Sequence, residues 1–407
     1  MRKAIFWLVV LGPIWAAVAL GADAPPAEQP QNIILLGWDG CHRDHVKALL
    51  KEDKLPNTKK LIAEGTLVDV DVTSGATDTK AGWTQILTGY RPAVTGVYNN
   101  GRFHDVPAGL SVFERLKAHF GADKFAAVAV IGKRQHCGEI NPPFKKSLDE
   151  AKGAGEKKAK KAGPLDPGAA ASGKIPQGQV VEENGKKFLV FGGSPYYTMH
   201  KACDEWHFGL TEDSKVGDKT IEMLDKYKAK PFFFFVHLAE VDHSGHKFGE
   251  PSKEYNDAII SGDTQLGRLV EKLKALGLYE KTKIYVVADH GFNVGAKGHG
   301  YAPYVFMATN DKKVMRDGTR ADITPAILDR FGLDLAKFEP KLDGEPLTKP
   351  AAKAVEKAPA EKPAGVGGGK AGGAAKAGGK AGKRAGKKDA GAEPAAPQPA
   401  AAPAVNQ

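Results

Sequence analysis

The segment Asn32–Trp38 reads NIILLGW, and Asp39 follows it directly. A continuous apolar run of this length, without polar alternation, is typical of a strand that is buried on both faces of a sheet. Three further segments have the same character and are bounded by glycine or polar residues: 125–131, 232–238 and 284–288. Together the four segments predict a central sheet whose strands are mostly parallel.

Helical patterns separate these segments, so the sequence predicts an α/β fold with a mostly parallel central sheet flanked by helices. The helical segments share apolar side chains at helical spacing and are residues 111–120, 213–228, 255–276 and 322–331. Gly277 and Gly332 follow two of these segments directly, at the position where helices commonly end. The sequence has no evident internal repeat.

The two ends of the chain differ in composition from the middle. Residues 1–22 predict a secretory signal peptide, because Arg2 and Lys3 precede an apolar run that ends in small residues. A membrane anchor is the alternative, although the run is short for a bilayer and Pro13 interrupts it. Residues 348–407 are mainly Ala, Gly, Lys and Pro, which predicts a disordered tail. A folded domain is therefore expected over residues 30–347, in a periplasmic or secreted protein.

The formal net charge of +10 is concentrated in low-complexity segments. Residues 351–407 hold ten Lys or Arg against four Asp or Glu, and residues 145–163 hold seven against three. The two segments account for the whole excess, so the folded part is close to neutral. We expect a flexible basic insertion over residues 145–180, weak contact of the basic tail with cell-surface anions, and no specific binding of nucleic acid.

The three cysteines, Cys41, Cys137 and Cys203, do not have the spacing of a metal site. In an exported chain they allow one disulfide and leave one thiol over, and the sequence does not choose the pair.

Aspartates stand at or shortly after the ends of three predicted strands, and histidines follow two of them in DHSGH, residues 242–246, and DHG, residues 289–291. A single Asp-His pair is usually a helix cap or a solvated surface group. Here, however, ligands of such sheets bind beyond the carboxyl ends of the strands, where these side chains would meet. Carboxylate and neutral imidazole are the usual ligands of catalytic zinc when no thiolate is offered. The candidate metal ligands are Asp39, Asp242, His246, Asp289, His290 and His299. His237 and His243 are expected to be structural or to support the ligands.

From residue 32 to residue 347 the sequence resembles the alkaline phosphatase superfamily, through Asp39 in GWDG, the DHSGH and ADHG motifs and the later GHG. The resemblance implies two zinc ions, or other divalent metals. It assigns Asp39, Asp289, His290 and the nucleophile to one ion, and Asp242, His246 and His299 to the other. No histidine follows His290 except His299, so the third late ligand of the family, if it exists here, must be that residue.

The stretch TDTKAGWTQILTG, residues 77–89, places Thr79 at a fixed distance before a Thr-Gly pair. The spacing is similar to that of the nucleophile in alkaline phosphatases, in the type I phosphodiesterase/nucleotide pyrophosphatase branch and, as cysteine, in sulfatases. The resemblance therefore implies that Thr79 is the nucleophile and a metal ligand, with Thr77 as the alternative. Thr79 also suits the start of a helix, whose positive end favours an incoming anion.

Two further positions resemble substrate-binding groups of the superfamily. Asn100 stands where the phosphodiesterase branch has an amide that donates to a phosphoryl oxygen, although Asn99 and Asn100 are also typical of a simple turn. Lys133 stands where related enzymes have a basic residue for the substrate anion. Arg134 and His136 match the same region more loosely.

The resemblance implies an exported hydrolase of small phosphate esters, either diesters or monoesters. Attack by Thr79 on phosphorus would give a phosphothreonine that water then hydrolyses, and two cations about 4 Å apart would stabilise the attacking and leaving oxygens. A sulfatase is one alternative, weakened by threonine at the position of the sulfatase cysteine. A phosphoethanolamine-type transferase and a binding protein with an inactive metal site are the others. The segment 141–197, which should shape the substrate pocket, does not identify the leaving group.

Overall fold

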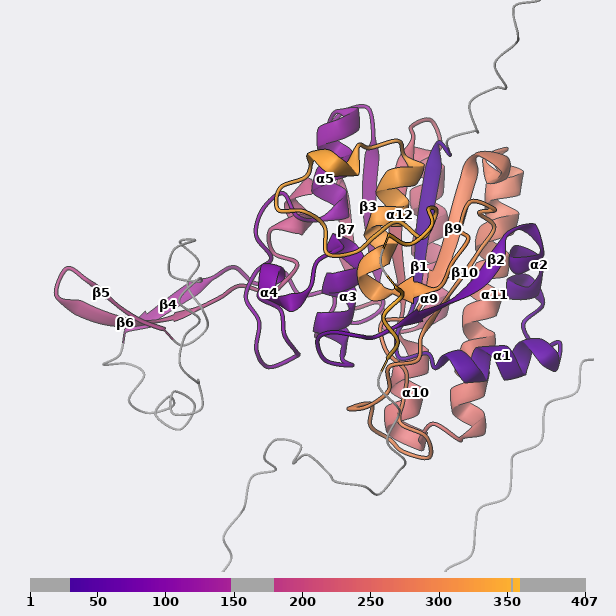
Figure 1. Cartoon of the computed structure of the whole chain (residues 1–407), viewed down its shortest axis with the longest axis horizontal. Helices are drawn as coiled ribbons and strands as arrows, with labels where there is room; N and C mark the ends of the chain where they lie inside the picture. Colours follow the sequence, from indigo (N-terminus) through magenta and orange to yellow (C-terminus); the bar gives the residue numbers. More distant parts are fainter. Residues whose placement is uncertain (1–29, 148–178, 353, 359–407) are drawn as a thin grey trace, which may run out of the picture. The chain divides into compact units, whose positions relative to one another are not determined.

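The structure is a computed structural model that describes residues 30–147, 179–352 and 354–358 (Figure 1). The predicted signal peptide, most of the predicted basic insertion and all but the first residues of the predicted tail lie outside these ranges. Within the described ranges, no helix has both the length and the apolar character needed to cross a membrane.

An eight-stranded sheet forms the centre of the domain (Figure 1). In spatial order its strands are β11 (Gly318–Thr319), β2 (Thr66–Asp71), β10 (Phe306–Thr309), β9 (Thr282–Val287), β1 (Asn32–Trp38), β8 (Phe232–Leu238), β3 (Ala126–Ile131) and β7 (Glu205–Phe208). Strand β10 is antiparallel to both neighbours, and all other pairs are parallel. The predicted α/β class with a mostly parallel sheet is therefore confirmed.

The four predicted strands are β9, β1, β8 and β3, which lie next to one another in the middle of the sheet. Their side chains are almost all buried, which explains why they read as continuous apolar runs. The outer strands were not predicted. In β2, for example, three of the six residues are polar (TLVDVD) and half of the positions are only partly buried.

Helices cover both faces of the sheet. The helices are α1 (Arg43–Lys51), α2 (Pro56–Glu64), α3 (Thr79–Thr88), α4 (Pro92–Thr95), α5 (Val112–Phe120), α9 (Asp213–Tyr227), α10 (Glu240–Phe248), α11 (Lys253–Ala275) and α12 (Ile323–Arg330). Short 3-10 turns are η1 (Met199–Ala202), η2 (Tyr279–Lys281), η3 (Arg320–Asp322) and η4 (Leu335–Lys337). Helix α11 contacts α1, α2, α9 and α10, whereas α12 contacts α3 and α5. The four predicted helices correspond to α5, α9, α11 and α12 within two residues at each end, and both predicted stop glycines have positive φ.

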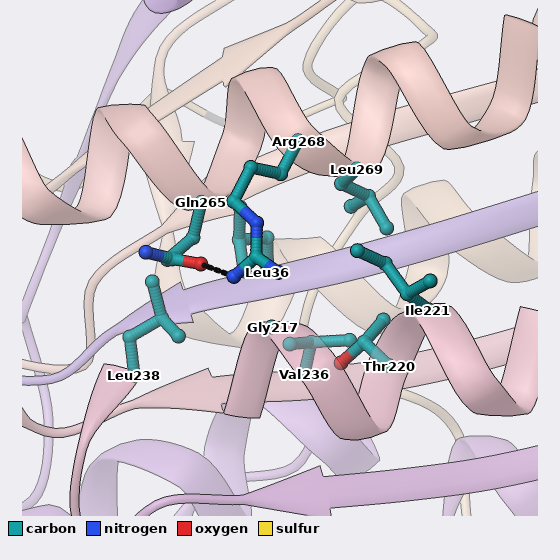
Figure 2. Close-up of a pocket in the computed structure, with 9 residues that line it drawn as sticks. All are labelled: Leu36, Gly217, Thr220, Ile221, Val236, Leu238, Gln265, Arg268 and Leu269. Carbon is teal, nitrogen blue, oxygen red and sulfur yellow. Dashed lines mark hydrogen bonds between the residues drawn. The ribbon is translucent and has the colours of Figure 1, made fainter. Parts of the chain in front are cut away.

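Alternate residues of the central strands identify the two faces. Leu36, Val236 and Leu238 face α9 and α11, where they line a small pocket (Figure 2). The other lining residues are Gly217, Thr220, Ile221, Gln265, Arg268 and Leu269, and none of the nine is a predicted site residue.

The opposite face of β1 carries Gly37, and Trp83 of α3 lies directly on it. A Cβ atom at Gly37 would lie 2.2 Å from Cη2 of Trp83, which is closer than any real contact. Trp83 also packs against Phe235 and His237 of β8. The glycine therefore lets α3, the helix that begins with Thr79, approach the sheet closely.

A separate three-stranded antiparallel sheet consists of β4 (Phe144–Ser147), β6 (Lys186–Phe191) and β5 (Gln179–Glu183). The expectation of a flexible insertion from residue 145 was wrong for residues 145–147, which belong to strand β4 and pair with β6, where Phe144 stacks on Phe191 at 4.7 Å between ring centroids. Lys145 and Lys146 are nevertheless exposed. All three cysteines are described and free, so the disulfide that the sequence allowed is not formed in this structure.

Candidate metal centre and active site

Three neighbouring strands deliver the predicted acids to one edge of the sheet. Trp38 of β1 is in register with Leu238 of β8, and Gly37 of β1 with Val287 of β9. The strands therefore end side by side, and the aspartates that follow them are all buried: Asp39, Asp242 and Asp289.

Three carboxylate oxygens lie around Nε2 of His290. Its Nε2 lies 3.7 Å from Asp39 Oδ1, 3.9 Å from Asp242 Oδ1 and 3.5 Å from Asp289 Oδ2. The ligand atoms of Asp39, Asp242 and His290 all lie within 4.8 Å of one another. Among the described residues, three of these atoms have no hydrogen-bond partner although they are buried: His290 Nε2, Asp242 Oδ1 and Asp289 Oδ2. Converging, unpaired ligand atoms of this kind fit a divalent cation.

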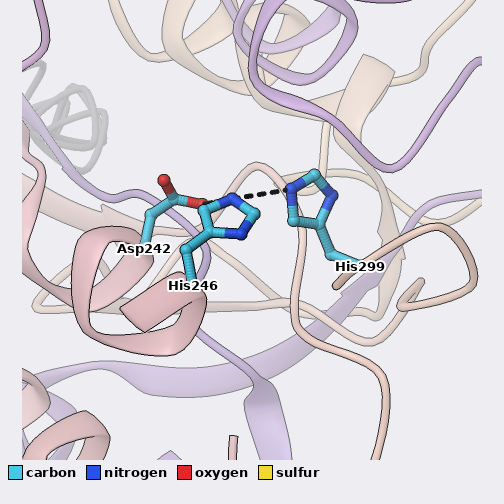
Figure 3. Close-up of side chains that lie close together, drawn as sticks. All are labelled: Asp242, His246 and His299. Atoms are coloured by element: carbon cyan, nitrogen blue, oxygen red, sulfur yellow. Dashed lines mark hydrogen bonds and ion pairs between the residues drawn. The ribbon is translucent and has the colours of Figure 1, made fainter. Parts of the chain in front are cut away.

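A second group consists of Asp242, His246 and His299, whose ligand atoms also lie within 4.8 Å of one another. Helix α10 places Asp242 and His246 one turn apart, with 3.4 Å between Asp242 Oδ1 and His246 Nε2. His299 approaches from the loop after β9, and its Nε2 lies 3.2 Å from that of His246 (Figure 3). Asp242 thus belongs to both groups.

The hydrogen bonds of the three imidazoles define which nitrogen is available. Nδ1 of His246 faces the carbonyl of Lys297 at 3.0 Å, and Nδ1 of His290 faces that of Gly291 at 2.9 Å. Nδ1 of His299 faces the carbonyl of Thr77. A carbonyl only accepts, so Nδ1 carries the proton in each neutral ring and Nε2 keeps a free lone pair. All three Nε2 atoms point into the candidate metal groups.

Burial keeps two of these histidines neutral. It lowers the pKa of His290, and it lowers the pKa of His299 to about 3, with the neighbouring His290 adding to the effect. Burial also raises the pKa of Asp289 well above its ordinary value, and the negative charge of Asp39 raises it further. The site therefore combines neutral imidazoles with carboxylates whose negative charges oppose one another, an arrangement that positive charge would stabilise.

The ammonium group of Lys133 lies among these carboxylates. Its Nζ is 2.7 Å from Asp39 Oδ1, 2.7 Å from Asp242 Oδ2 and 3.0 Å from Thr79 Oγ1. Burial alone would lower the pKa of Lys133, but the attraction of Asp39 and Asp242 outweighs it and raises that pKa above its ordinary value. The ammonium group of Lys133 therefore contacts both carboxylates and the hydroxyl of the predicted nucleophile.

Thr79 begins helix α3 and is buried. Asp78 caps the helix, with its Oδ1 accepting from the backbone N–H of Ala81. The hydroxyl of Thr77, the alternative nucleophile, donates to the carbonyl of His299. Thr77 thus holds the His299 loop, whereas Thr79 lies beside Lys133.

Asn100 and Asn99 have different roles. The backbone N–H of Lys80 donates to Asn100 Oδ1 at 2.9 Å, and that of Asn100 donates to Asp78 Oδ2 at 2.8 Å. Because Oδ1 is occupied by a donor, the Nδ2 group of Asn100 is the side that remains to donate. The turn belongs to Asn99, whose Oδ1 accepts from the backbone N–H groups of Gly101 and Arg102.

The four remaining predicted residues are His237, His243, Arg134 and His136. His237 Nε2 is 2.7 Å from Asp39 Oδ2 and so supports a candidate ligand. Burial lowers the pKa of His243. Arg134 lies over the ring of Phe208, and His136 has the unusual φ of 70°.

Sequence reasoning missed three residues that hold the site together. Trp83 Nε1 donates to Asp39 Oδ2 at 3.0 Å. Its place one helical turn after Thr79 is a signal that could have indicated it. Asp78 joins Asn100 to the start of α3, and Arg320 contacts the backbone of Asp289. Their roles depend on contacts across long stretches of sequence.

Carboxylates and unprotonated imidazole nitrogens at the carboxyl edge of a mostly parallel sheet, beside a helix that begins with a hydroxyl, define an α/β protein with a candidate two-metal centre. The chain belongs to the type I phosphodiesterase/nucleotide pyrophosphatase family, whose model matches residues 33–342. The predicted resemblance to this branch is thereby confirmed. Its homologues are phosphoric ester hydrolases.

Individual relatives match shorter stretches. The chain is 39% identical over 97 residues to venom phosphodiesterase CdcPDE of Crotalus durissus collilineatus, covering 24% of this chain and 11% of that protein. It is 40% identical over 60 residues to the bis(5'-adenosyl)-triphosphatase ENPP4 of Pongo abelii, covering 14% of this chain and 13% of that protein. Among solved structures, alkaline phosphatase from the Antarctic bacterium TAB5 is similar over 75% of this chain and 99% of that chain, with 14% identity and a TM-score of 0.45.

Proposed function

We propose that this protein is an exported, metal-dependent hydrolase of small phosphate esters in which Thr79 is the nucleophile. The observation that carries the proposal is the convergence of three buried, unpaired ligand atoms, on His290, Asp242 and Asp289, next to the Lys133–Thr79 contact. Family membership supports the reaction class, and divalent metals are general cofactors of the family.

The candidate ligands divide into two sets, and Asp242, which is assigned to the second set, also lies close to the first. Asp39, Asp289, His290 and Thr79 would hold one zinc ion, and Asp242, His246 and His299 the other. The side chains offer oxygen and imidazole nitrogen and no thiolate, which suits zinc and also admits other divalent metals. When bound, two such ions would supply positive charge that favours the Thr79 alkoxide and stabilises the attacking and leaving oxygens.

The protein groups then account for the covalent step. Thr79 Oγ forms a bond to phosphorus and loses its proton while the bond from phosphorus to the leaving oxygen breaks, and the leaving oxygen takes up a proton. Lys133 Nζ and Asn100 Nδ2 would donate to the phosphoryl oxygens, which carry most of the charge. Water then hydrolyses the phosphothreonine and restores the free hydroxyl.

Export rests on the composition of residues 1–22. The presence of a venom phosphodiesterase among the relatives is consistent with a role outside the cytoplasm. The basic tail would at most add weak contacts with anionic surfaces.

The proposal is tested by the activity of the zinc-loaded protein on an aryl phosphate monoester, an aryl phosphate diester and an aryl sulfate. Hydrolysis of a phosphate ester that depends on zinc and on Thr79 is the expected result, and the ratio of the two phosphate activities defines the substrate preference. A Thr79→Ala protein as active as the wild type would exclude the mechanism, and hydrolysis of the sulfate alone would favour a sulfatase.

A further inference from the structure

Arg320 is a buried cation with neutral hydrogen-bond partners. Only 1% of its surface is exposed. Its Nε donates to Gln85 Oε1 at 2.8 Å, and its two Nη groups donate to the carbonyls of Asp289 at 2.8 Å, Ser74 at 2.9 Å and Ala76 at 3.2 Å. Within the described ranges, none of these hydrogen bonds goes to a carboxylate. Because a buried charge is usually paired with an opposite charge, this arrangement calls for an explanation.

The partners of Arg320 belong to three different parts of the candidate site. The carbonyl of Asp289 is part of the peptide group that joins Asp289 to His290. Ser74 and Ala76 lead into Thr77, which is bonded to His299 through both its hydroxyl and its carbonyl. A single planar guanidinium group thus connects candidate ligands of both metal groups.

The third part is helix α3. Gln85, which accepts from Arg320 Nε, is on this helix, and its Nε2 donates to Ser74 Oγ at 2.8 Å. Gly82 of the same helix packs so closely that a Cβ atom there would lie 2.6 Å from Asp289 Cβ and 3.0 Å from Arg320 Nη1. The position of the helix that begins with Thr79 is therefore tied to Arg320 and Asp289.

Arg330 provides a comparison within the same segment of the chain. It is also buried, but its Nε donates to the carboxylate of Asp311 at 2.7 Å, and Asp311 also accepts from Tyr285. That is a buried ion pair, and neither Arg330 nor Asp311 is a candidate metal ligand. The rigid fork of Arg320 instead fixes backbone carbonyls, a task that the single ammonium of lysine does not reproduce.

We propose that Arg320 is a positioning residue for metal binding, which holds the Asp289–His290 peptide and the Thr77–His299 contact at the spacing that a pair of divalent cations requires. The inference rests on the proposed metal-dependent function. Groups that orient metal ligands from outside typically change metal affinity by about 10- to 100-fold when they are replaced.

The test compares Arg320→Lys with the matched control Arg330→Lys. Zinc affinity of the metal-stripped full-length proteins is measured by competition with a fluorescent chelator, and the melting temperature of each stripped protein is measured separately. We expect Arg320→Lys to weaken zinc binding about 10-fold or more. Arg330→Lys is expected to keep the zinc affinity of the wild type within about twofold. This should hold even if Arg330→Lys lowers the melting temperature as much as Arg320→Lys does.

Arg320→Lys with wild-type zinc affinity would overturn the inference, as would equal weakening in both variants. A wild type that binds no zinc would instead overturn the proposed function. If Arg320→Lys does not fold, Gln85→Met replaces it, because this change removes one acceptor of Arg320 and leaves the guanidinium in place. Weaker zinc binding in Gln85→Met supports the inference, and unchanged binding contradicts it.

Discussion

Nε2 of His290 lies 3.5 Å from Oδ2 of Asp289, and within the described ranges neither atom has a hydrogen-bond partner. Both side chains are fully buried. Since buried polar atoms are nearly always paired, two such atoms at this separation fit the ligands of a divalent cation. The carbonyl of Gly291 faces Nδ1 of His290, so Nε2 presents its lone pair toward the carboxylates.

Replacement of the predicted nucleophile should abolish turnover. Thr79→Ala is expected to lower kcat by roughly 10³-fold or more, because nothing else forms the covalent bond to phosphorus. Thr88→Ala is the matched control on the same helix, since the Thr88 hydroxyl donates to the carbonyl of Thr84 and accepts from the backbone N–H of Tyr90. Steady-state rates on an aryl phosphate ester measure both variants, and comparable losses in the two would contradict the role of Thr79.

Asn100 and Asn99 form a second matched pair. Asn100→Asp keeps the oxygen that accepts from Lys80 but replaces the free donor by a negative charge, so kcat/KM should fall about 10²- to 10³-fold. Asn99→Asp preserves the two turn hydrogen bonds, and its kcat/KM should stay within about threefold of the wild type. The assignment would be wrong if the two variants had the same kcat/KM.

Lys133 should affect substrate and metal in opposite ways. Lys133→Met removes a donor to the phosphoryl group, and we expect kcat/KM to fall about 10²-fold. The same change removes a cation that competes for Asp39 and Asp242, so zinc affinity should be unchanged or higher. Chelator competition together with kinetics separates the two effects. A variant that loses zinc would show that the ammonium supports the ligands.

Asp213 should make stability depend on pH. Burial raises its pKa to about 7, and the neighbouring Glu240 adds to the shift. Because the folded state then holds a proton that the unfolded state releases, stability falls as pH rises from about 4 to 7, and the loss is complete above pH 7. Asp213→Asn keeps an acceptor for the N–H groups of Ala239 and Glu240, so it should be more stable than the wild type at pH 8, by about 1–3 kcal/mol, and not at pH 4. Calorimetric unfolding at both pH values measures the difference, and an equal difference at both would exclude this ionisation.

The centre of the fold could be predicted from the sequence because strands β1, β3, β8 and β9 are buried on both faces. Each of them therefore consists of a nearly continuous run of apolar residues. The same strands carry Asp39, Asp289 and Lys133 at or just beyond their ends, so their meeting at one edge followed from parallel pairing. Strand β10 could not be predicted in the same way, since it has only four residues. Its antiparallel direction depends on pairing with β9 and β2.

The supporting contacts were beyond sequence reasoning for a different reason. The bonds from Arg320 to Ser74 and from Thr77 to His299 each join residues more than 200 positions apart. An arginine at position 320 and a threonine at position 77 are not unusual, so composition and spacing do not indicate these hydrogen bonds. The different hydrogen-bonding roles of Asn99 and Asn100 likewise depend on which backbone N–H groups the folded turn places beside each side-chain amide.

The most direct test of the account is the recovery of activity as zinc is added to the metal-stripped protein. With an aryl phosphate ester as substrate, hydrolysis should be absent without metal and should rise to its maximum as two equivalents bind, while Thr79→Ala binds zinc through the remaining ligands and stays inactive. A stripped protein that hydrolyses the ester at the full rate, or a protein that binds two equivalents without any gain in activity, would contradict the account.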